Sequence, residues 1–409
     1  MSTVNFVTKN APWLAAGATL TFLSSFGQTF FISIFAGEIR EAFGLSHGEW
    51  GGIYSLGTAV SALVMVWAGG LTDRFRVRAL GPVVLIGLAL ACISVTITPA
   101  AWFLPVAVFL LRLFGQGMCS HTAVVAMTRW FVATRGRAVS IATLGFSVGE
   151  ALLPLVFVSL MAVFDWRILW VLCAGICVLG IPILMSLLRQ ERTPQSIAQG
   201  QSSVGMQNRH WTRNETLRHP LFWFCVPSIL GPAAFNTAFF FHQVHYAEVK
   251  GWAHLDLVAF FPVYTAASIG LMMAYGWALD RFGTARLMPT YQLPSVLAFI
   301  VFSTAVSPLG ALVGFLLMAA TTGANSTRPN AFWAEFFGTR NIGSIKAMAA
   351  AVMVLGSAIG PGVTGVLVDM GISLERQYLF IAAYFLFAAL LLWLGIRRYK
   401  SELPATVAA

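Results

Sequence analysis

Apolar runs of about 20 residues recur along the whole chain and alternate with short polar segments. This is the length that an α-helix needs to cross the hydrocarbon core of a bilayer. The pattern predicts an all-α membrane protein with twelve transmembrane helices. We place them at 13–36, 49–70, 79–98, 102–128, 138–162, 168–188, 220–246, 255–278, 287–306, 309–334, 345–368 and 376–396.

The longest polar segment divides these helices into two groups of six. It covers residues 189–219 and reads RQERTPQSIAQGQSSVGMQNRHWTRNETLRH, a composition rich in Gln, Ser, Gly and Asn that cannot bury a core. We therefore predict an N-terminal six-helix bundle over 1–188, a cytoplasmic linker over 189–219 and a C-terminal six-helix bundle over 220–409.

The composition agrees with a bilayer environment. Of the 409 residues, 58% are hydrophobic and 10% are charged, whereas soluble proteins carry roughly 25% charged residues. The N-terminal MSTVNFVTKNAPW lacks the regions of a cleaved signal peptide, so the first apolar run is expected to be a spanning helix. The five cysteines lie in apolar runs without metal-ligand spacing, and we expect them to be packing residues.

Lysine and arginine are distributed unevenly between the predicted loops. If the N-terminus lies inside, the outside segments hold only Arg40, Arg167, Lys250 and Arg376, and nearly all other basic residues lie inside. This bias predicts a multi-pass protein of a cell membrane, such as a bacterial inner membrane, with both termini in the cytoplasm. The net charge of +10 then reflects topology, and without a contiguous basic face we expect no nucleic-acid partner.

A charged turn occurs twice in the chain. GGLTDRFRVRA, residues 69–79, joins predicted helices 2 and 3, and GWALDRFGTAR, residues 276–286, joins helices 8 and 9. The offset of 207 residues that aligns Asp73 with Asp280 also aligns Gly149 with Gly356 in helices 5 and 11. The two bundles are therefore pseudo-symmetric repeats, an arrangement that occurs in secondary transporters with a substrate site between the halves.

The paired G-x-x-x-D-R-F turn, the six-plus-six helices and the long central segment resemble the major facilitator superfamily over about residues 13–397. The resemblance implies that the turns latch the cytoplasmic side shut in one conformation. The predicted gating residues are Asp73, Arg74, Asp280 and Arg281. The alternative for the arginines is simple anchoring to lipid phosphates, but an acid at the same membrane edge works against a simple anchor.

Two charges lie deep in predicted helices, where a charge usually faces a cavity or a partner. Arg112 in helix 4 and Glu150 in helix 5 are equally far along the chain from the hairpin tip, which places them at similar depth. We predict that they couple transport to protons, with a purely structural ion pair as the alternative. Arg112 also resembles the arginine of the family's R-x-x-Q-G pattern, here R-L-F-G-Q-G with Gln116 displaced by one.

A second arginine provides the leading substrate-binding candidate. Arg328 in helix 10 corresponds to His121 in helix 4 at the same offset of 207. The alternatives are that Arg328 snorkels to headgroups or pairs with Glu335, and that His121 is a hydrogen-bonded packing residue. The other predicted substrate-binding residues are polar groups on helices that the resemblance places around the cavity, namely Gln28, Asn236, His242, Tyr264 and Asn325.

The glycine-proline stretch GSAIGPGVTG in helix 11 predicts a closely packed helix seam. It is similar to the antiporter motif of the superfamily. That motif belongs on helix 5, however, where this chain has GFSVGEALLP without the Gly-Pro pair. This difference weakens the interpretation as a proton-driven drug antiporter.

We predict a monomeric secondary transporter that works by alternating access, is coupled to protons and carries a small organic anion such as a monocarboxylate. Symport is the expected mode, and the sequence leaves antiport open as the alternative. Two arginines against one glutamate would make the cavity cationic, and guanidinium groups bind carboxylates in a bidentate way. No catalytic, nucleotide-binding or zinc motif occurs in the sequence, so we expect no enzymatic activity, cofactor or metal.

The helix 4–5 run is similar to the monocarboxylate and oxalate/formate branches of the superfamily, although helix 8 lacks the membrane arginine often found there. One alternative is an exporter of hydrophobic or amphipathic compounds, with the aromatic FNTAFFFH of helix 7 lining its cavity. A remote alternative is a transport-inactive membrane sensor.

Overall fold

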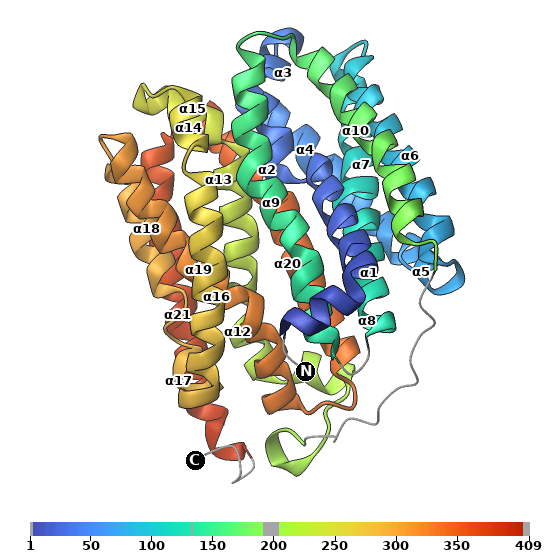
Figure 1. Cartoon of the computed structure of the whole chain (residues 1–409). Coiled ribbons are helices and arrows are strands. Elements are labelled where there is room, and N and C mark those ends of the chain that lie inside the picture. The colour runs from blue at the N-terminus through green and yellow to red at the C-terminus, as the bar shows by residue number, and fades with distance from the viewer. Residues whose placement is uncertain (1–2, 132–133, 191–203, 404–409) are drawn as a thin grey trace. The chain divides into compact units, whose positions relative to one another are not determined.

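The computed structural model describes residues 3–131, 134–190 and 204–403 (Figure 1). The side chains of residues 3, 4, 73, 135, 280, 326–331 and 343 lie outside the described part. Helices make up 86% of the chain, and the described residues contain no strand. The chain divides into two compact units. The first is Met1–Gln199 with Phe240–His245, and the second is Gly200–Phe239 with Tyr246–Ala409.

Ten of the described helices are long and apolar enough to cross a membrane. They are His47–Ala68, Val77–Thr96, Ala101–Trp130, Gly136–Met161, Trp166–Leu187, Pro220–Phe241, His254–Leu279, Pro308–Asn325, Ser344–Asp369 and Leu374–Glu402. Asn5–Gly27 and Thr29–Phe43 form one further span with a bend of 48°, and the shorter apolar helix Leu293–Thr304 lies where the ninth helix was predicted. These segments correspond to the twelve predicted helices, and the predicted all-α membrane fold is confirmed.

The first unit is built from the N-terminal helices. Its elements are α1 (Thr3–Leu23), η1 (Ser24–Gly27), α2 (Thr29–Ile32), η2 (Ser33–Phe35), α3 (Ala36–Phe43), α4 (His47–Ala68), α5 (Leu71–Arg74), α6 (Val77–Thr96), η3 (Ala101–Phe103), α7 (Leu104–Leu111), η4 (Arg112–Cys119), α8 (Ser120–Trp130), α9 (Arg135–Met161) and α10 (Trp166–Leu187). The closest helix packing in this unit is between α6 and α10 and between α1 and α9, which lie side by side in Figure 1.

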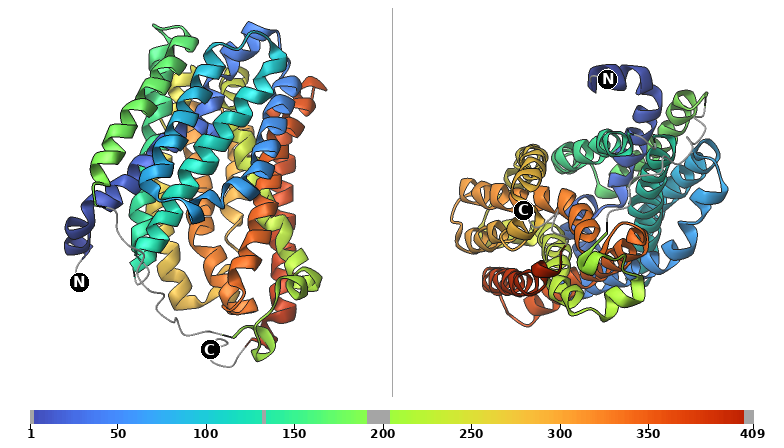
Figure 2. Two further views of the ribbon diagram at one scale, coloured as in Figure 1. Left: turned by 90° about the vertical axis from the view of Figure 1, so that its right-hand side faces the viewer. Right: turned by 90° about the horizontal axis from the view of Figure 1, so that it is seen from below.

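The second unit begins within the predicted linker. Its elements are η6 (Met206–Asn208), α11 (Arg213–Arg218), α12 (Pro220–Gly231), η7 (Pro232–Asn236), α13 (Thr237–Phe241), α14 (Gln243–Lys250), α15 (His254–Val258), α16 (Phe261–Phe282), α17 (Thr284–Leu287), α18 (Leu293–Thr304), α19 (Pro308–Phe337), α20 (Ile342–Asp369), α21 (Leu374–Tyr399) and η8 (Lys400–Glu402). The last residues of α13 and the start of α14 belong to the first unit. The right-hand view of Figure 2, seen from below, looks along the long helices of each unit.

The first span differs from the single straight helix predicted over residues 13–36. It begins at Thr3, tightens into the 3-10 turn η1 and breaks at Gln28, whose backbone is extended at φ −91° and ψ 153°. The reason is a close approach between helices: a Cβ atom on Gly27 would lie 2.1 Å from the Leu111 carbonyl oxygen. This tertiary contact cannot be recognised from hydropathy, since the apolar run continues through the break.

Glycines of α9 pack directly on the first helix. A Cβ atom on Gly145 would lie 2.0 Å from the carbonyl oxygen of Ala18, and one on Gly149 would lie 2.0 Å from Ser25 Oγ. Only a residue without a side chain allows the two helix backbones to approach this closely. The seam holds α9 against the stretch of chain that leads into the break.

The second unit repeats this seam at the equivalent place. Gly356 of α20, the counterpart of Gly149, packs on Leu230, and a Cβ atom there would lie 2.9 Å from the Leu230 carbonyl oxygen. One turn later, a Cβ atom on Gly360 would lie 2.2 Å from the carbonyl oxygen of Ala234. The sequence repeat therefore corresponds to a repeated helix contact, and GSAIGPGVTG is a packing seam.

We expect Gly145→Ala to destabilise the first unit, because the added methyl group meets a backbone carbonyl that cannot rotate away. Overpacking of this kind costs about 1–3 kcal/mol. The measurement is thermal unfolding of the purified protein in detergent. Gly175→Ala in α10 is the matched control, since a Cβ atom there meets nothing within 4 Å. Equal melting temperatures for the two variants would show that α9 does not depend on this contact.

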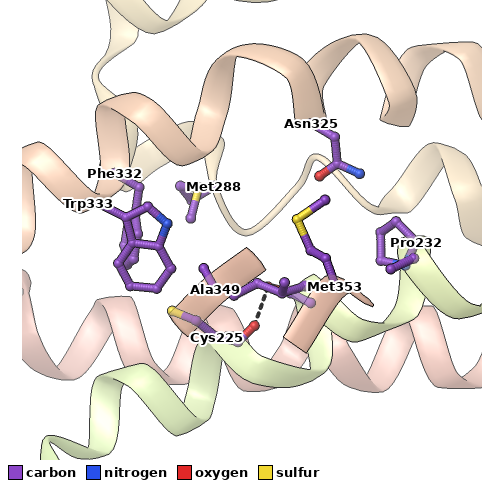
Figure 3. Close-up of a pocket in the computed structure, with 11 residues that line it drawn as sticks. Cys225, Pro232, Met288, Asn325, Phe332, Trp333, Ala349 and Met353 are labelled. Carbon is purple, nitrogen blue, oxygen red and sulfur yellow. Dashed lines mark hydrogen bonds between the residues drawn. The ribbon is translucent and has the colours of Figure 1, made fainter. Parts of the chain in front are cut away.

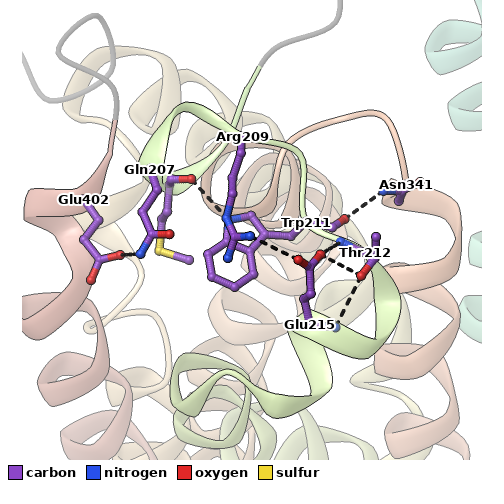
Figure 4. Close-up of polar contacts among 8 residues, drawn as sticks. Gln207, Arg209, Trp211, Thr212, Glu215, Asn341 and Glu402 are labelled. Carbon is purple, nitrogen blue, oxygen red and sulfur yellow. Dashed lines mark hydrogen bonds and ion pairs between the residues drawn. The ribbon is translucent and has the colours of Figure 1, made fainter.

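The second part of the predicted linker folds onto the second unit. Met206 is 0% exposed and Trp211 is 4% exposed. The Trp211 amide donates to the Phe337 carbonyl at 3.0 Å, and Asn341 Nδ2 donates to the Trp211 carbonyl at 3.0 Å (Figure 4). Residues 189–219 are polar on average, so their composition did not reveal Met206 and Trp211. These two buried side chains anchor residues 204–218 to the ends of α19 and α20.

Charged groups complete this anchor. The Arg209 guanidinium lies 3.9 Å from the Trp211 ring centroid and pairs with Glu215 at 3.0 Å. Glu215 and Thr212 form a capping box at the start of α11. Hydrogen bonds from the Thr212 side chain and backbone, together with the charge of Arg209, lower the pKa of the Glu215 carboxyl group. Burial lowers the pKa of His219, so this imidazole is held in its neutral form beside the Trp211 and Tyr399 rings.

Candidate functional site

Arg112 is the most deeply buried charge among the described residues, with 1% of its surface exposed. It opens η4, a π-helical stretch in the middle of the fourth span, and such local widening of a helix is frequent at functional sites. Its Nη1 atom donates to the Gly27 carbonyl and to Thr29 Oγ1, both at 3.3 Å. Its Nε atom has no hydrogen-bond partner among the described residues, so the guanidinium keeps one donor available for a ligand.

The break in the first span provides the acceptors for Arg112. The amide groups of Phe31 and Ile32 both donate to the Gln28 carbonyl, and the Gly27 carbonyl is left to accept from the guanidinium. Two glycines allow the first and fourth spans to come this close. A Cβ atom on Gly115 would lie 2.6 Å from the Gly27 Cα atom. Gln28 is 8% exposed, and its neighbours in the sequence, Gly27 and Thr29, accept the hydrogen bonds from Arg112.

Tyr54 and Thr29 are further members of this site that the sequence analysis missed. Tyr54, in the middle of α4, is 0% exposed, and its ring centroid lies 5.4 Å from the Arg112 Cζ atom. Its hydroxyl group shares a short hydrogen bond with Thr29 Oγ1. Neither residue carries a charge or a motif, so only the contacts between three helices reveal them.

Glu150 lies half-buried in α9, next to Gly149, which packs on Ser25 of η1. Its helix therefore contacts the same broken segment that supplies the acceptors for Arg112. The contacts described for Arg112 itself are those with Gly27, Thr29 and Tyr54. Pairing of Arg112 with Glu150 stays a prediction.

His121 lies against the first charged turn. Its Nε2 atom is 3.5 Å from Thr72 Oγ1, and a Cβ atom on Gly69 would meet the same nitrogen at 3.4 Å. Arg129, two turns further along α8, donates to the Thr72 carbonyl. The fourth span thus supports the turn through two side chains, which places the substrate-binding candidate His121 beside a gating candidate.

The two arginines predicted to gate, Arg74 and Arg281, are exposed. Arg74 points to the surface, and the Arg281 guanidinium lies 5.5 Å from the Trp277 ring centroid and 5.8 Å from that of Phe282. The side chains of Asp73 and Asp280 lie outside the described part, as does that of Arg328 in α19. Their predicted roles in gating and substrate binding stay predictions.

The remaining candidates are distributed over both units. Tyr264 is 2% exposed and its hydroxyl group lies 3.1 Å from Thr322 Oγ1. Asn236 closes η7, and its buried Oδ1 atom has no hydrogen-bond partner among the described residues. His242 is 3% exposed and belongs to the first unit, where its ring centroid lies 6.2 Å from that of His47.

Asn325 lines a cavity of about 60 Å³ inside the second unit, which is large enough for several water molecules. Figure 3 shows Asn325 projecting from α19 toward the side formed by Met353 and Pro232, while Trp333 lies at the opposite end. The remaining lining residues are Cys225, Ser228, Ile229, Ala233, Met288, Phe332 and Ala349. The wall is predominantly apolar, with the aromatic rings of Phe332 and Trp333 at one end and the Asn325 amide beside Met353 at the other.

The family model that describes the Major Facilitator Superfamily matches residues 17–361 of this chain. The chain belongs to the Major Facilitator Superfamily. No curated protein matches the sequence of this transporter. The resemblance seen in the paired turns is thereby confirmed, and the chain is a multi-pass membrane transporter with the alternating-access fold.

Solved structures show the same fold for this superfamily transporter. A bacterial homologue of the human lysosomal transporter Spinster, in an inward-facing and unoccupied conformation, is similar with a TM-score of 0.75 at 15% identity, over 97% of this chain and 98% of that chain. The nucleoside transporter NupG is similar with a TM-score of 0.71 at 13% identity, over 95% of this chain and 100% of that chain. These likenesses concern the fold of the transporter.

Proposed function

We propose that this transporter carries a small organic anion, such as a monocarboxylate, across a cell membrane by proton symport. The observation that carries the proposal is Arg112, a buried guanidinium at a helix break whose Nε atom has no hydrogen-bond partner in the described part of the chain. A buried cation is costly unless a partner compensates it. An anionic substrate supplies this compensation when it binds, so binding energy is concentrated at one charge.

The neighbours of Arg112 favour a carboxylate over a larger anion. Thr29 and Gln28, at the break in the first span, carry a hydroxyl group and an amide. Tyr54 of α4 carries a second hydroxyl group. Neutral donors next to a guanidinium fork are suited to the two oxygen atoms of a carboxylate. Arg328, His121, Asn236, His242, Tyr264 and Asn325 are proposed as further substrate contacts, in line with their positions in the sequence.

Proton coupling is assigned to Glu150 together with Arg112. Glu150 is half-buried in α9, and its neighbour Gly149 packs on the broken segment that supplies the acceptors for Arg112, so a rearrangement of that segment would change the surroundings of the carboxyl group. Asp73, Arg74, Asp280 and Arg281 are proposed to gate the side on which both termini lie. By the positive-inside rule this side is the cytoplasm, and we propose that the transporter is a monomer in a bacterial inner membrane.

A second candidate function is export of hydrophobic or amphipathic compounds. The cavity of the second unit favours it, since nine of its eleven lining residues are apolar and only Ser228 and Asn325 are polar. Flexible thioethers and aromatic rings adapt to apolar ligands of different shapes. Under this candidate Arg112 would be a helix-stabilising residue, and the apolar cavity would bind cargo.

Uptake by proteoliposomes with an imposed inward proton gradient separates the two functions. We expect accumulation of radiolabelled monocarboxylates, tested as formate, lactate and benzoate, that collapses when a protonophore dissipates the gradient. An amphipathic dye such as ethidium should show no gradient-dependent movement. Movement of the dye without any movement of the acids would reject the anion proposal and support the exporter. Protein-free liposomes are the control, since weak acids cross lipid in their neutral form.

A further inference from the structure

A short segment of the C-terminal half is part of the first unit. Residues 240–245 cluster with Met1–Gln199, although Phe239 and Tyr246 on either side belong to the second unit. Gln243 is 0% exposed, and its Nε2 atom donates to the Phe30 carbonyl at 3.2 Å and to Ser33 Oγ at 2.8 Å. Ser33 Oγ in turn donates to the Phe240 carbonyl at 2.7 Å. The segment is therefore seated on the first span just beyond its break.

Phe241 inserts between two aromatic residues of α4. It is 1% exposed. Its ring centroid lies 4.6 Å from that of Tyr54, and 5.7 Å from that of Trp50 in a stacked arrangement. All three rings are buried. Removing segment 240–245 from this seat would leave the Tyr54 ring without one of its two neighbours.

The other contacts of Tyr54 are with the candidate anion site. The Arg112 Cζ atom lies 5.4 Å from the Tyr54 ring centroid, and the Tyr54 hydroxyl bonds to Thr29, which also accepts from Arg112. One rigid ring therefore contacts both segment 240–245 and the guanidinium group. Because buried side chains are packed at crystal-like density, the ring cannot shift at one contact without disturbing the other.

We propose that Tyr54 is a positioning residue through which the seating of segment 240–245 sets the orientation of the Arg112 guanidinium. When Phe241 is seated, Tyr54 holds the guanidinium against Gly27 and Thr29 with its Nε atom available. When the segment leaves, Tyr54 relaxes and the guanidinium loses this orientation. The consequence for transport rests on the proposed function, since it links anion affinity to the position of a segment of the other half of the chain.

The first test reads the guanidinium directly and needs no substrate. All five native cysteines, which are buried, are replaced by alanine, and Gln28→Cys provides a reporter thiol next to the Arg112 acceptors. Its reaction rates with an anionic and a cationic methanethiosulfonate are compared. The nearby positive charge should favour the anionic reagent, and the ratio of the two rates reports how the guanidinium faces the thiol.

We expect Phe241→Leu and Tyr54→Phe each to lower this ratio by about threefold or more, since residues in direct contact are energetically coupled. The double variant should lower the ratio no further than the stronger of the two single variants, because Phe241 acts on the guanidinium only through Tyr54. Phe239→Leu is the matched control: Phe239 lies two residues earlier in α13, is also 1% exposed, and its described ring contacts include Phe302 at 4.3 Å and Phe315 at 5.5 Å.

An unchanged ratio in both single variants, additive effects in the double variant, or an equal drop in Phe239→Leu would overturn the proposal. If Phe241→Leu does not give a folded protein by size-exclusion chromatography, Phe241→Met provides the same readout with a longer flexible side chain. Lactate uptake is measured in parallel, where a raised KM with little change in maximal rate is expected. A shifted ratio without any acid transport would leave the positioning role in place and reject the proposed substrate instead.

Discussion

Arg112→Lys is expected to raise the KM for the transported anion by about 10- to 100-fold, since hydrogen bonds to a charged group contribute about 1.5–3 kcal/mol and 1.4 kcal/mol is a factor of ten. Lysine keeps the positive charge but replaces a planar fork by a single ammonium group. All of its N–H donors lie on one nitrogen, so it cannot donate to the Gly27 carbonyl and Thr29 Oγ1 while a second nitrogen, like Nε of arginine, faces a ligand. The measurement is concentration-dependent uptake of lactate by proteoliposomes.

Two further variants identify the cause of that loss. Thr29→Val removes one acceptor of the guanidinium while the charge and the shape of the side chain at position 29 are largely kept, and a smaller rise in KM is expected. Arg397→Lys is the control for arginine replacement in general, since this exposed guanidinium in α21 lies 5.1 Å from the Trp393 ring centroid and has no proposed role in transport. Full uptake by Arg112→Lys, with KM unchanged, would remove Arg112 from the substrate site.

Glu150→Gln is expected to abolish accumulation driven by a proton gradient while exchange of substrate at equilibrium continues. Glutamine has nearly the same shape as a protonated glutamate but cannot release a proton. A carrier locked in this form can still shuttle the loaded site between the two sides of the membrane. Proteoliposome assays in the two modes, gradient-driven uptake and counterflow exchange, measure the separation.

Glu49→Gln is the matched control for Glu150→Gln, because Glu49 is an exposed carboxylate at the start of α4 in the same unit. It should keep both modes. Equal loss of both modes in Glu150→Gln would instead make Glu150 a structural or substrate-binding residue. If Glu150 pairs with Arg112, Arg112→Ala should impair the protein more than neutral replacement of both residues, because the single change strands a carboxylate in a site of low exposure.

The number of helices and their division into two related halves could be predicted from the sequence. A bilayer has no water for backbone groups, so each span must be built from apolar, mainly helical segments, and that requirement is visible within any window of about 20 residues. The repeat was equally accessible, because Asp73, Gly149 and their counterparts keep one offset along the chain. The prominence of Arg112 also came from local sequence, since one charge in an apolar run is conspicuous.

The tertiary structure alone decided how that charge is accommodated. The first span breaks at Gln28 because Gly27 and Gly115 meet, a contact between residues 88 positions apart. Tyr54 and Thr29 join the site although neither is conspicuous in its own helix. Phe241 reaches the same tyrosine from the other half of the chain. Hydropathy records only how apolar a neighbourhood in the sequence is, whereas these contacts depend on which small, aromatic and polar side chains meet when separate helices pack.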